Sequence, residues 1–178
     1  MRLIDKGYLK MSSKIQELIS PSGKFKAVIH ENQDSFSIDL FILSDNSETG
    51  SSDKWLRKNI TSILCDKIYY PRAVAINELR KIMSDPDTPL SIEWVRDFSF
   101  CENARFVSPD SIDVYSTWGD SCKEEDSIKV KTIIDFSGLC IIEEVGYENV
   151  WQMGEINDKG AIHCFNEYGN IKDALKSL

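Results

Sequence analysis

The fold is decided by residues 24–44, KFKAVIHENQDSFSIDLFILS. Polar and apolar side chains alternate through residues 24–31 and again through residues 35–44, as they do in strands with one buried face. Residues 32–35 between the two runs are polar and typical of a turn. A Ser-Pro-Ser-Gly turn at residues 20–23 leads into the first run, since proline fixes φ and glycine permits a positive φ. The pattern predicts an antiparallel hairpin of residues 24–31 and 35–44.

A helix is predicted downstream of this hairpin. Apolar side chains recur at near-helical spacing through residues 72–83, RAVAINELRKIM, and Pro71 suits the first turn of a helix. We expect this amphipathic helix to lie against the sheet. Residues 84–89 contain two prolines and end it. Residues 44–54 are polar and predict a loop, and residues 55–70 fit either a short helix or a strand.

The remainder of the chain is predicted to consist mostly of strands. Turn-forming residues separate seven predicted strands, which are residues 91–100, 104–108, 111–118, 127–136, 139–145, 149–155 and 160–165. A short helix with Asn170 as its N-cap closes the chain. The sequence therefore predicts an α+β fold, a curved antiparallel β-sheet (a meander) with one or two helices packed on one face. We expect a single α+β domain over residues 1–178, with residues 1–14 as an irregular N-terminal extension.

Charge is unevenly distributed along the chain. The 178 residues include 21 basic and 29 acidic side chains, a formal net charge of −8. Residues 85–126 carry 3 basic and 11 acidic side chains, a net charge of −8. The net charge of residues 1–84 is +3, and that of residues 127–178 is −3. This balance argues against nucleic acid as a partner, because phosphate contacts need clustered Lys and Arg. The chain contains no apolar run that suits a membrane span or a signal peptide, so we expect a cytoplasmic protein with no membrane partner.

The sequence carries no motif that specifies a reaction. Five cysteines are spread singly, a poor pattern for disulfides or a zinc site, so we expect reduced and mostly buried thiols. His163 and Cys164 are adjacent in a predicted strand and would point to opposite faces, so they cannot act together as base and nucleophile. Acidic pairs are more often part of a solvated face than of a metal site. The sequence therefore predicts no catalytic residues, no metal and no cofactor, and we expect that the protein is not an enzyme.

Two stretches of the sequence are distinctive. The first is residues 18–29, LISPSGKFKAVI. The second consists of Trp151, residues 160–164 (GAIHC) and Tyr168-Gly169, which precede the last helix. Together these stretches, about a quarter of the chain, resemble small immunity proteins of bacterial contact-dependent growth inhibition and polymorphic toxin systems. The resemblance implies a cytoplasmic protein that binds and blocks the C-terminal domain of one cognate toxin, often a nuclease. Such a partner would be basic, which agrees with the acidic balance of this chain.

An acidic surface is the predicted binding site for that partner. Charge speeds the encounter with a basic protein, and an aromatic side chain supplies area to bury. Trp118 at a predicted strand end is the candidate anchor, whereas we expect Trp94 in the core. The predicted partner-binding residues are Asp110, Asp113, Trp118, Asp120, Glu124, Glu125 and Asp126.

Two other function classes stay open. The first is an enzyme or a small-molecule-binding α+β domain of unrecognised family, which would need a pocket where His163 or Cys164 meets two carboxylates. The second is a scaffold that assembles with itself through an exposed strand edge. A toxin inhibitor is expected to be a monomer or a weak dimer, which separates it from a self-assembling scaffold.

Overall fold

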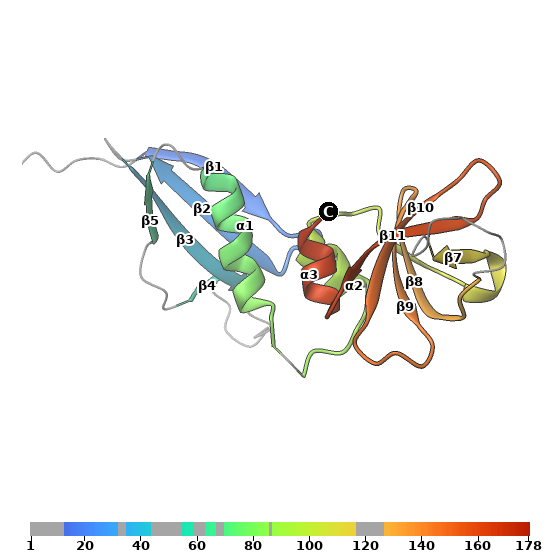
Figure 1. Cartoon of the computed structure of the whole chain (residues 1–178). Coiled ribbons are helices and arrows are strands. Elements are labelled where there is room, and N and C mark those ends of the chain that lie inside the picture. Colours follow the sequence, from blue (N-terminus) through green and yellow to red (C-terminus); the bar gives the residue numbers. More distant parts are fainter. Residues whose placement is uncertain are drawn as a thin grey trace, which may run out of the picture. The chain divides into compact units, whose positions relative to one another are not determined.

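The predicted hairpin forms the centre of the first of two sheets (Figure 1). Strand β2 (Phe25–Glu31) pairs antiparallel with β3 (Ser35–Leu43), and Ile29 lies opposite Ile38. Both isoleucine side chains are buried, at 0% and 1% exposure. Because side chains alternate across a strand, Ala27 and Ile29 of β2 share one face with Ile38 and Leu40 of β3, and all four are buried. The hairpin prediction is therefore confirmed.

Three further strands extend this sheet on both sides of the hairpin. Strand β1 (Ser13–Ile19) pairs antiparallel with β2. Strands β4 (Trp55–Arg57) and β5 (Ile63–Asp66) both pair antiparallel with β3, at different parts of its length. The sequence left residues 55–70 open between helix and strand, and their described parts include these two short strands.

Helix α1 (Pro71–Ile82) covers one face of this sheet, against β2 and β3 (Figure 1). Its start agrees with the expected role of proline in a first turn, and its Ala75 and Leu79 are fully buried. Met83, which follows the helix as its C-cap, is buried as well. These residues recur at intervals of four, which places them on one side of the helix. The helix predicted over residues 72–83 is confirmed.

The described residues of this computed structural model are 13–31, 35–43, 55–58, 63–66, 70–85, 87–116 and 127–178. The chain divides into two compact units, residues 1–88 and residues 89–178, which we call the N-terminal unit and the C-terminal unit. Both units combine helices with antiparallel strands, so the predicted α+β class is confirmed. The single domain stays a prediction, which one cooperative unfolding transition would confirm.

The second sheet belongs to the C-terminal unit and contains six strands. In spatial order they are β6 (Arg105–Val107), β8 (Val130–Phe136), β9 (Leu139–Glu144), β10 (Trp151–Ile156), β11 (Ile162–Tyr168) and β7 (Val114–Ser116). The pairing of β7 with β11 is parallel, and the other strand pairs are antiparallel. The predicted meander is thus present, with one parallel strand added at its edge.

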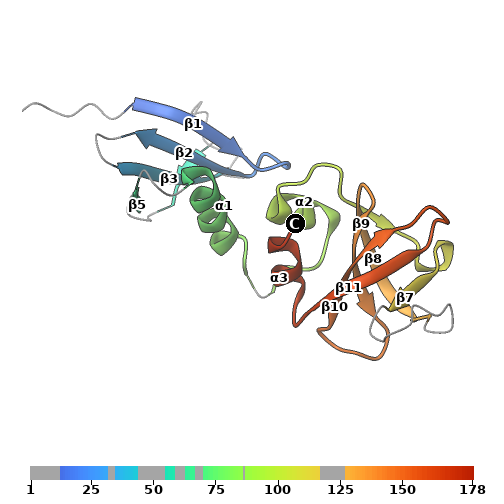
Figure 2. The same cartoon turned by 45° about the horizontal axis from the view of Figure 1, so that its top comes forward.

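This second sheet curls until its edge strand meets the chain that leads into β8 (Figure 2). Tyr115 of β7 forms an antiparallel bridge with Ser127, and the Ile128 amide donates a hydrogen bond to the Val114 carbonyl oxygen at 2.9 Å. Apolar side chains fill the inside of the curl. Its buried members are Val114, Ile133, Cys140, Ile142, Ile162 and Cys164.

The strand predicted over residues 91–100 is wrong, because this segment forms helix α2 (Ile92–Ser99). The hydroxyl of Ser91 caps its start by accepting a hydrogen bond from the Trp94 amide at 3.2 Å. Val95 and Phe98 are fully buried, and the half-buried Trp94 stacks on Phe98 with ring centroids 5.0 Å apart. Spacings of three and four residues place these side chains on one side of a helix, which a period of two does not explain.

Helix α3 (Ile171–Lys176) closes the chain as predicted. Asn170 caps it, because its side-chain oxygen accepts a hydrogen bond from the Asp173 amide at 2.9 Å. The helix packs against α2 and against strands β9, β10 and β11, and buries Ala174 and Leu175. Helices α2 and α3 therefore pack together in the C-terminal unit, whereas the sequence predicted a strand in place of the first.

Gly154 provides a test of how closely β10 and β11 pack. A methyl group at this position would lie 2.7 Å from the carbonyl oxygen of His163 and 2.8 Å from Cγ2 of Ile162. We expect Gly154→Ala to lower the free energy of unfolding by about 1–3 kcal/mol, because backbone must move to admit it. Urea denaturation followed by circular dichroism measures this change.

The matched control is Gly169→Ala, since a methyl group there would meet no atom within 4 Å. Its free energy of unfolding is expected to stay within about 0.5 kcal/mol of the wild-type value. Equal effects of the two substitutions would contradict the close packing at Gly154.

Candidate functional site

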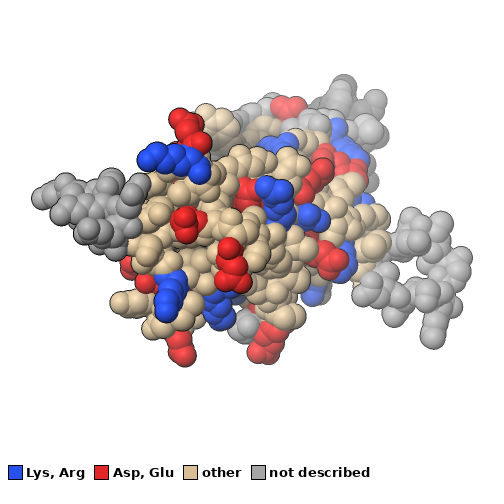
Figure 3. Space-filling view, turned by 90° about the vertical axis from the view of Figure 1, so that its right-hand side faces the viewer, with Lys and Arg blue, Asp and Glu red and all other residues tan. Residues whose placement is uncertain are grey.

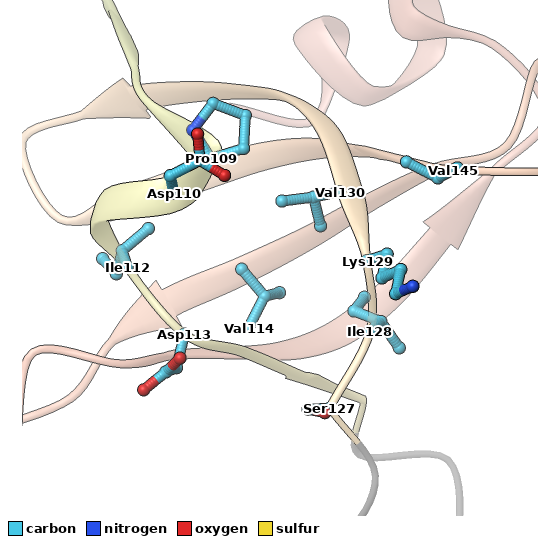
Figure 4. A pocket seen from close by; sticks show the side chains of 10 residues that line it. All are labelled: Pro109, Asp110, Ile112, Asp113, Val114, Ser127, Ile128, Lys129, Val130 and Val145. Atoms are coloured by element: carbon cyan, nitrogen blue, oxygen red, sulfur yellow. The ribbon is translucent and has the colours of Figure 1, made fainter.

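An open cavity of about 420 Å³ lies in the C-terminal unit, where the turn before β7 meets the chain that leads into β8 (Figure 4). Its lining residues are Pro109, Asp110, Ile112, Asp113, Val114, Ser127, Ile128, Lys129, Val130 and Val145. Ile112, Val114 and Val130 point toward its middle, and Asp110 lies at its edge (Figure 4). The cavity therefore combines an apolar interior with charged groups around it.

Backbone hydrogen bonds fix the segment of the cavity wall that contains Asp110 and Asp113. The 3-10 turn η1 (Pro109–Ser111) closes with the Ser111 amide donating to the Ser108 carbonyl oxygen at 3.1 Å. Two residues later, the Asp113 carbonyl oxygen accepts a hydrogen bond from the Ile162 amide at 2.8 Å. Asp110 and Asp113 are both exposed. Their backbones are thus held in place while their carboxylates remain available to a partner.

The structure brings two of the seven predicted partner-binding residues together. Asp110 and Asp113 both line the cavity. The other five lie outside the described residues, and these are Trp118, Asp120, Glu124, Glu125 and Asp126. The apolar half of the cavity was missed at the sequence level, although Ile112 alternates with Val114 and Ile128 with Val130. That alternation places each pair on one face of its strand.

The net negative charge of the chain comes entirely from the C-terminal unit. Residues 1–88 carry 13 basic and 12 acidic side chains, whereas residues 89–178 carry 8 and 17, a net charge of −9. On the face drawn in Figure 3, acidic side chains are interspersed with basic ones rather than gathered in one patch. The unit is therefore acidic as a whole, and its cavity is what distinguishes one part of its surface.

Two acidic residues of this unit are buried and do not belong to its accessible surface. Asp97 is 3% exposed and Asp135 is 2% exposed. The Asp135 carboxylate accepts hydrogen bonds from Arg105 Nε at 2.8 Å and from the Gly138 amide at 2.7 Å. These bonds tie β6 to β8 and to the turn that follows β8, so Asp135 stabilises the curled sheet.

His163 and Cys164 point to opposite faces of β11, as predicted. Cys164 is fully buried inside the curl, whereas His163 is half-buried with its ring centroid 5.4 Å from that of Tyr115. Burial raises the pKa of the Cys164 thiol to about 12, and burial followed by the charge of Asp135 raises that of Cys140 to about 12. Neither thiol is a nucleophile at neutral pH, because the thiolate is the reactive form.

The other histidine lies in a charged cluster on the N-terminal sheet, on the face that does not carry Ile29. His30 Nε2 is 3.4 Å from Asp39 Oδ2, and Arg57 also contacts the Asp39 carboxylate. On the same face, the Lys26 ammonium lies 4.2 Å from the ring centroid of Trp55. Each of these charged groups has a partner on this face, so their positions have a structural explanation. Within the described residues, no group of three or more His, Cys, Asp or Glu side chains could hold a metal ion.

Comparison of the chain with protein-family models, with curated proteins and with solved structures finds no match. In the parts of the chain that the structure describes, each helix is too short or too polar to cross a bilayer.

The buried thiols give a prediction about labelling. We expect an alkylating reagent to leave Cys140 and Cys164 unmodified in the native protein at pH 7 and at pH 9. A pKa near 12 leaves about one thiol in a thousand ionised even at pH 9, so raising the pH has little effect. Mass spectrometry of the digested protein measures the modification. Both residues are expected to react after denaturation.

Cys101, which is free and partly exposed, is the internal control for reagent access. It is expected to react in the native state. Native labelling of Cys140 or Cys164 at the rate of Cys101 would contradict the burial described above.

Proposed function

We propose that this chain is an immunity protein, a cytoplasmic protein that binds and neutralises a basic toxin domain, often a nuclease, of a bacterial polymorphic toxin system. The observation that carries the proposal is a cavity lined by Asp110 and Asp113 together with apolar side chains, in a unit of net charge −9. An acidic surface with apolar area to bury matches a basic protein, because opposite charges steer the encounter and apolar burial retains the complex.

The mode of inhibition follows from what a nuclease needs. Nucleases hold phosphates with Lys and Arg side chains, so carboxylates that pair with those side chains exclude the nucleic acid. An interface of ordinary size buries about 1,600 Å² in total, which is more than the cavity alone supplies. The proposal therefore keeps the five predicted residues outside the described part of the chain as partner-binding residues.

The proposal predicts that the reading frame immediately upstream encodes the toxin domain, and the test uses that domain. Producing this chain in the same cells is expected to restore growth that the toxin domain arrests. The purified proteins are expected to form a complex whose association slows as salt rises, since salt screens exposed charges.

A matched pair of variants shows whether the acidic unit is responsible. Charge reversal at both Asp110 and Asp113 is expected to slow association, whereas reversal at both Asp85 and Asp87, two exposed carboxylates of the N-terminal unit, is expected to leave it unchanged. Growth arrest that persists in the presence of folded wild-type chain, or the lack of a complex at low salt, would contradict the proposal.

A second candidate function is the binding of a small molecule, and the cavity is the observation that favours it. Its volume of about 420 Å³ falls within the range of about 300–1,000 Å³ that is usual for ligand pockets, and pockets also form at the mouths of curled sheets. Native mass spectrometry of protein purified from cells distinguishes this function, because a retained ligand would add a fixed mass to the chain.

A further inference from the structure

We propose that strand β1 pairs antiparallel with the β1 strand of a second copy of this chain, so that the two N-terminal sheets join into one. This inference goes beyond the proposed function and does not depend on it. It assigns an interaction surface to the N-terminal unit, whereas the cavity lies in the C-terminal unit.

Strand β1 is a long strand at the edge of its sheet. It has seven residues and stands at the end of the strand order, with β2 on one side (Figure 2). In the described part of the chain, no strand pairs with its other side. The outer strands β4, β5 and β6 have only three or four residues. An edge strand presents backbone N–H and C=O groups that another strand can pair with, and β1 offers the longest such row.

Two opposite charges share one face of β1. Lys14 lies opposite His30 in the register of β1 and β2, and Glu17 lies opposite Val28. His30 and Val28 are two positions apart in β2 and therefore point to the same face. The Lys14 ammonium contacts the Glu17 carboxylate on that face, and both residues are exposed. A β-bulge explains the spacing of three, because the register shifts between Lys14 and Gln16.

These charges select one register for a pair of β1 strands. In an antiparallel pair about a twofold axis, Lys14 of each copy can lie opposite Glu17 of the other. Because cross-strand neighbours point to the same face, both contacts then join opposite charges on the face described above. A slip by one residue would place Lys14 opposite Gln16 or Leu18, which point to the other face. The edge is therefore complementary to itself.

Such a pairing closes at two copies. A twofold axis uses the same edge of both copies, so neither copy has a free β1 edge left for a third. One pair of strands makes a small interface, and small interfaces belong to weak complexes. We therefore expect a weak dimer rather than a growing assembly.

The first experiment follows the oligomeric state of the full chain by sedimentation velocity from about 5 µM to about 500 µM. The average mass of the wild type is expected to rise with concentration, from that of one chain toward that of two. Lys14→Glu and Glu17→Lys each place like charges opposite one another at two points. Each variant is therefore expected to lower the association constant by at least about tenfold. Wild-type protein that stays a monomer at every concentration overturns the proposal.

The second experiment mixes the two variants in equal amounts. In a mixed dimer both contacts again join opposite charges, so the mixture is expected to associate within about twofold of the wild type. Loss of the contact within one chain cannot produce this recovery, because both variants lack it. A mixture that associates no better than either variant alone overturns the proposal.

The matched control is Lys81→Glu. Lys81 forms an exposed ion pair with Glu78, also three residues away, on helix α1. The control changes the net charge by the same amount as Lys14→Glu and is expected to dimerise like the wild type, and an equal loss in the control overturns the proposal. Circular dichroism checks that each variant is folded. The chain is measured alone, so these results leave the test of toxin binding separate.

Discussion

The C-terminal unit depends on one constraint, the meeting of β7 with the chain that leads into β8. Tyr115 bridges Ser127, and Val114 accepts a hydrogen bond from the Ile128 amide, while the other edge of β7 pairs with β11. This double pairing closes the curl around a buried apolar interior. It also brings the turn before β7 against the start of β8, and the cavity is the space left between them. Core and candidate site therefore share one origin.

Patterns within single elements predicted their structures well. The hairpin of β2 and β3 and helix α1 follow from local alternation and local spacing, which the sequence displays directly. The strand prediction for residues 91–100 was wrong because the apolar side chains at Ile92, Trp94 and Phe98 also fit a period of two. This segment forms a helix because α2 packs against α3, at the far end of the chain, and because Ser91 caps its start. The first of these is a tertiary contact that local patterns do not contain.

The candidate site was predictable in part for a similar reason. Asp110 and Asp113 stood out because the charge of the chain concentrates in residues 85–126, and both residues line the cavity. Their apolar neighbours across the cavity come from the residues before β8 and from Val145 after β9. Only the strand order brings these segments to the turn before β7, and strand order is not readable from one sequence. The charge pattern of the sequence therefore indicated Asp110 and Asp113, whereas the apolar residues across the cavity depend on the strand order.

The parallel pairing of β7 with β11 also bears on the order of events in folding. Ile162 follows its partner Val114 by 48 positions, whereas β8 and β9 are joined by the two-residue turn Ser137-Gly138. Short hairpins form within microseconds, but the entropy of closing a long loop delays distant pairings. We therefore expect the hairpins to form first and β7 to dock last. An intermediate that holds only the hairpins lacks the cavity, and recognition becomes possible in the step that completes the fold.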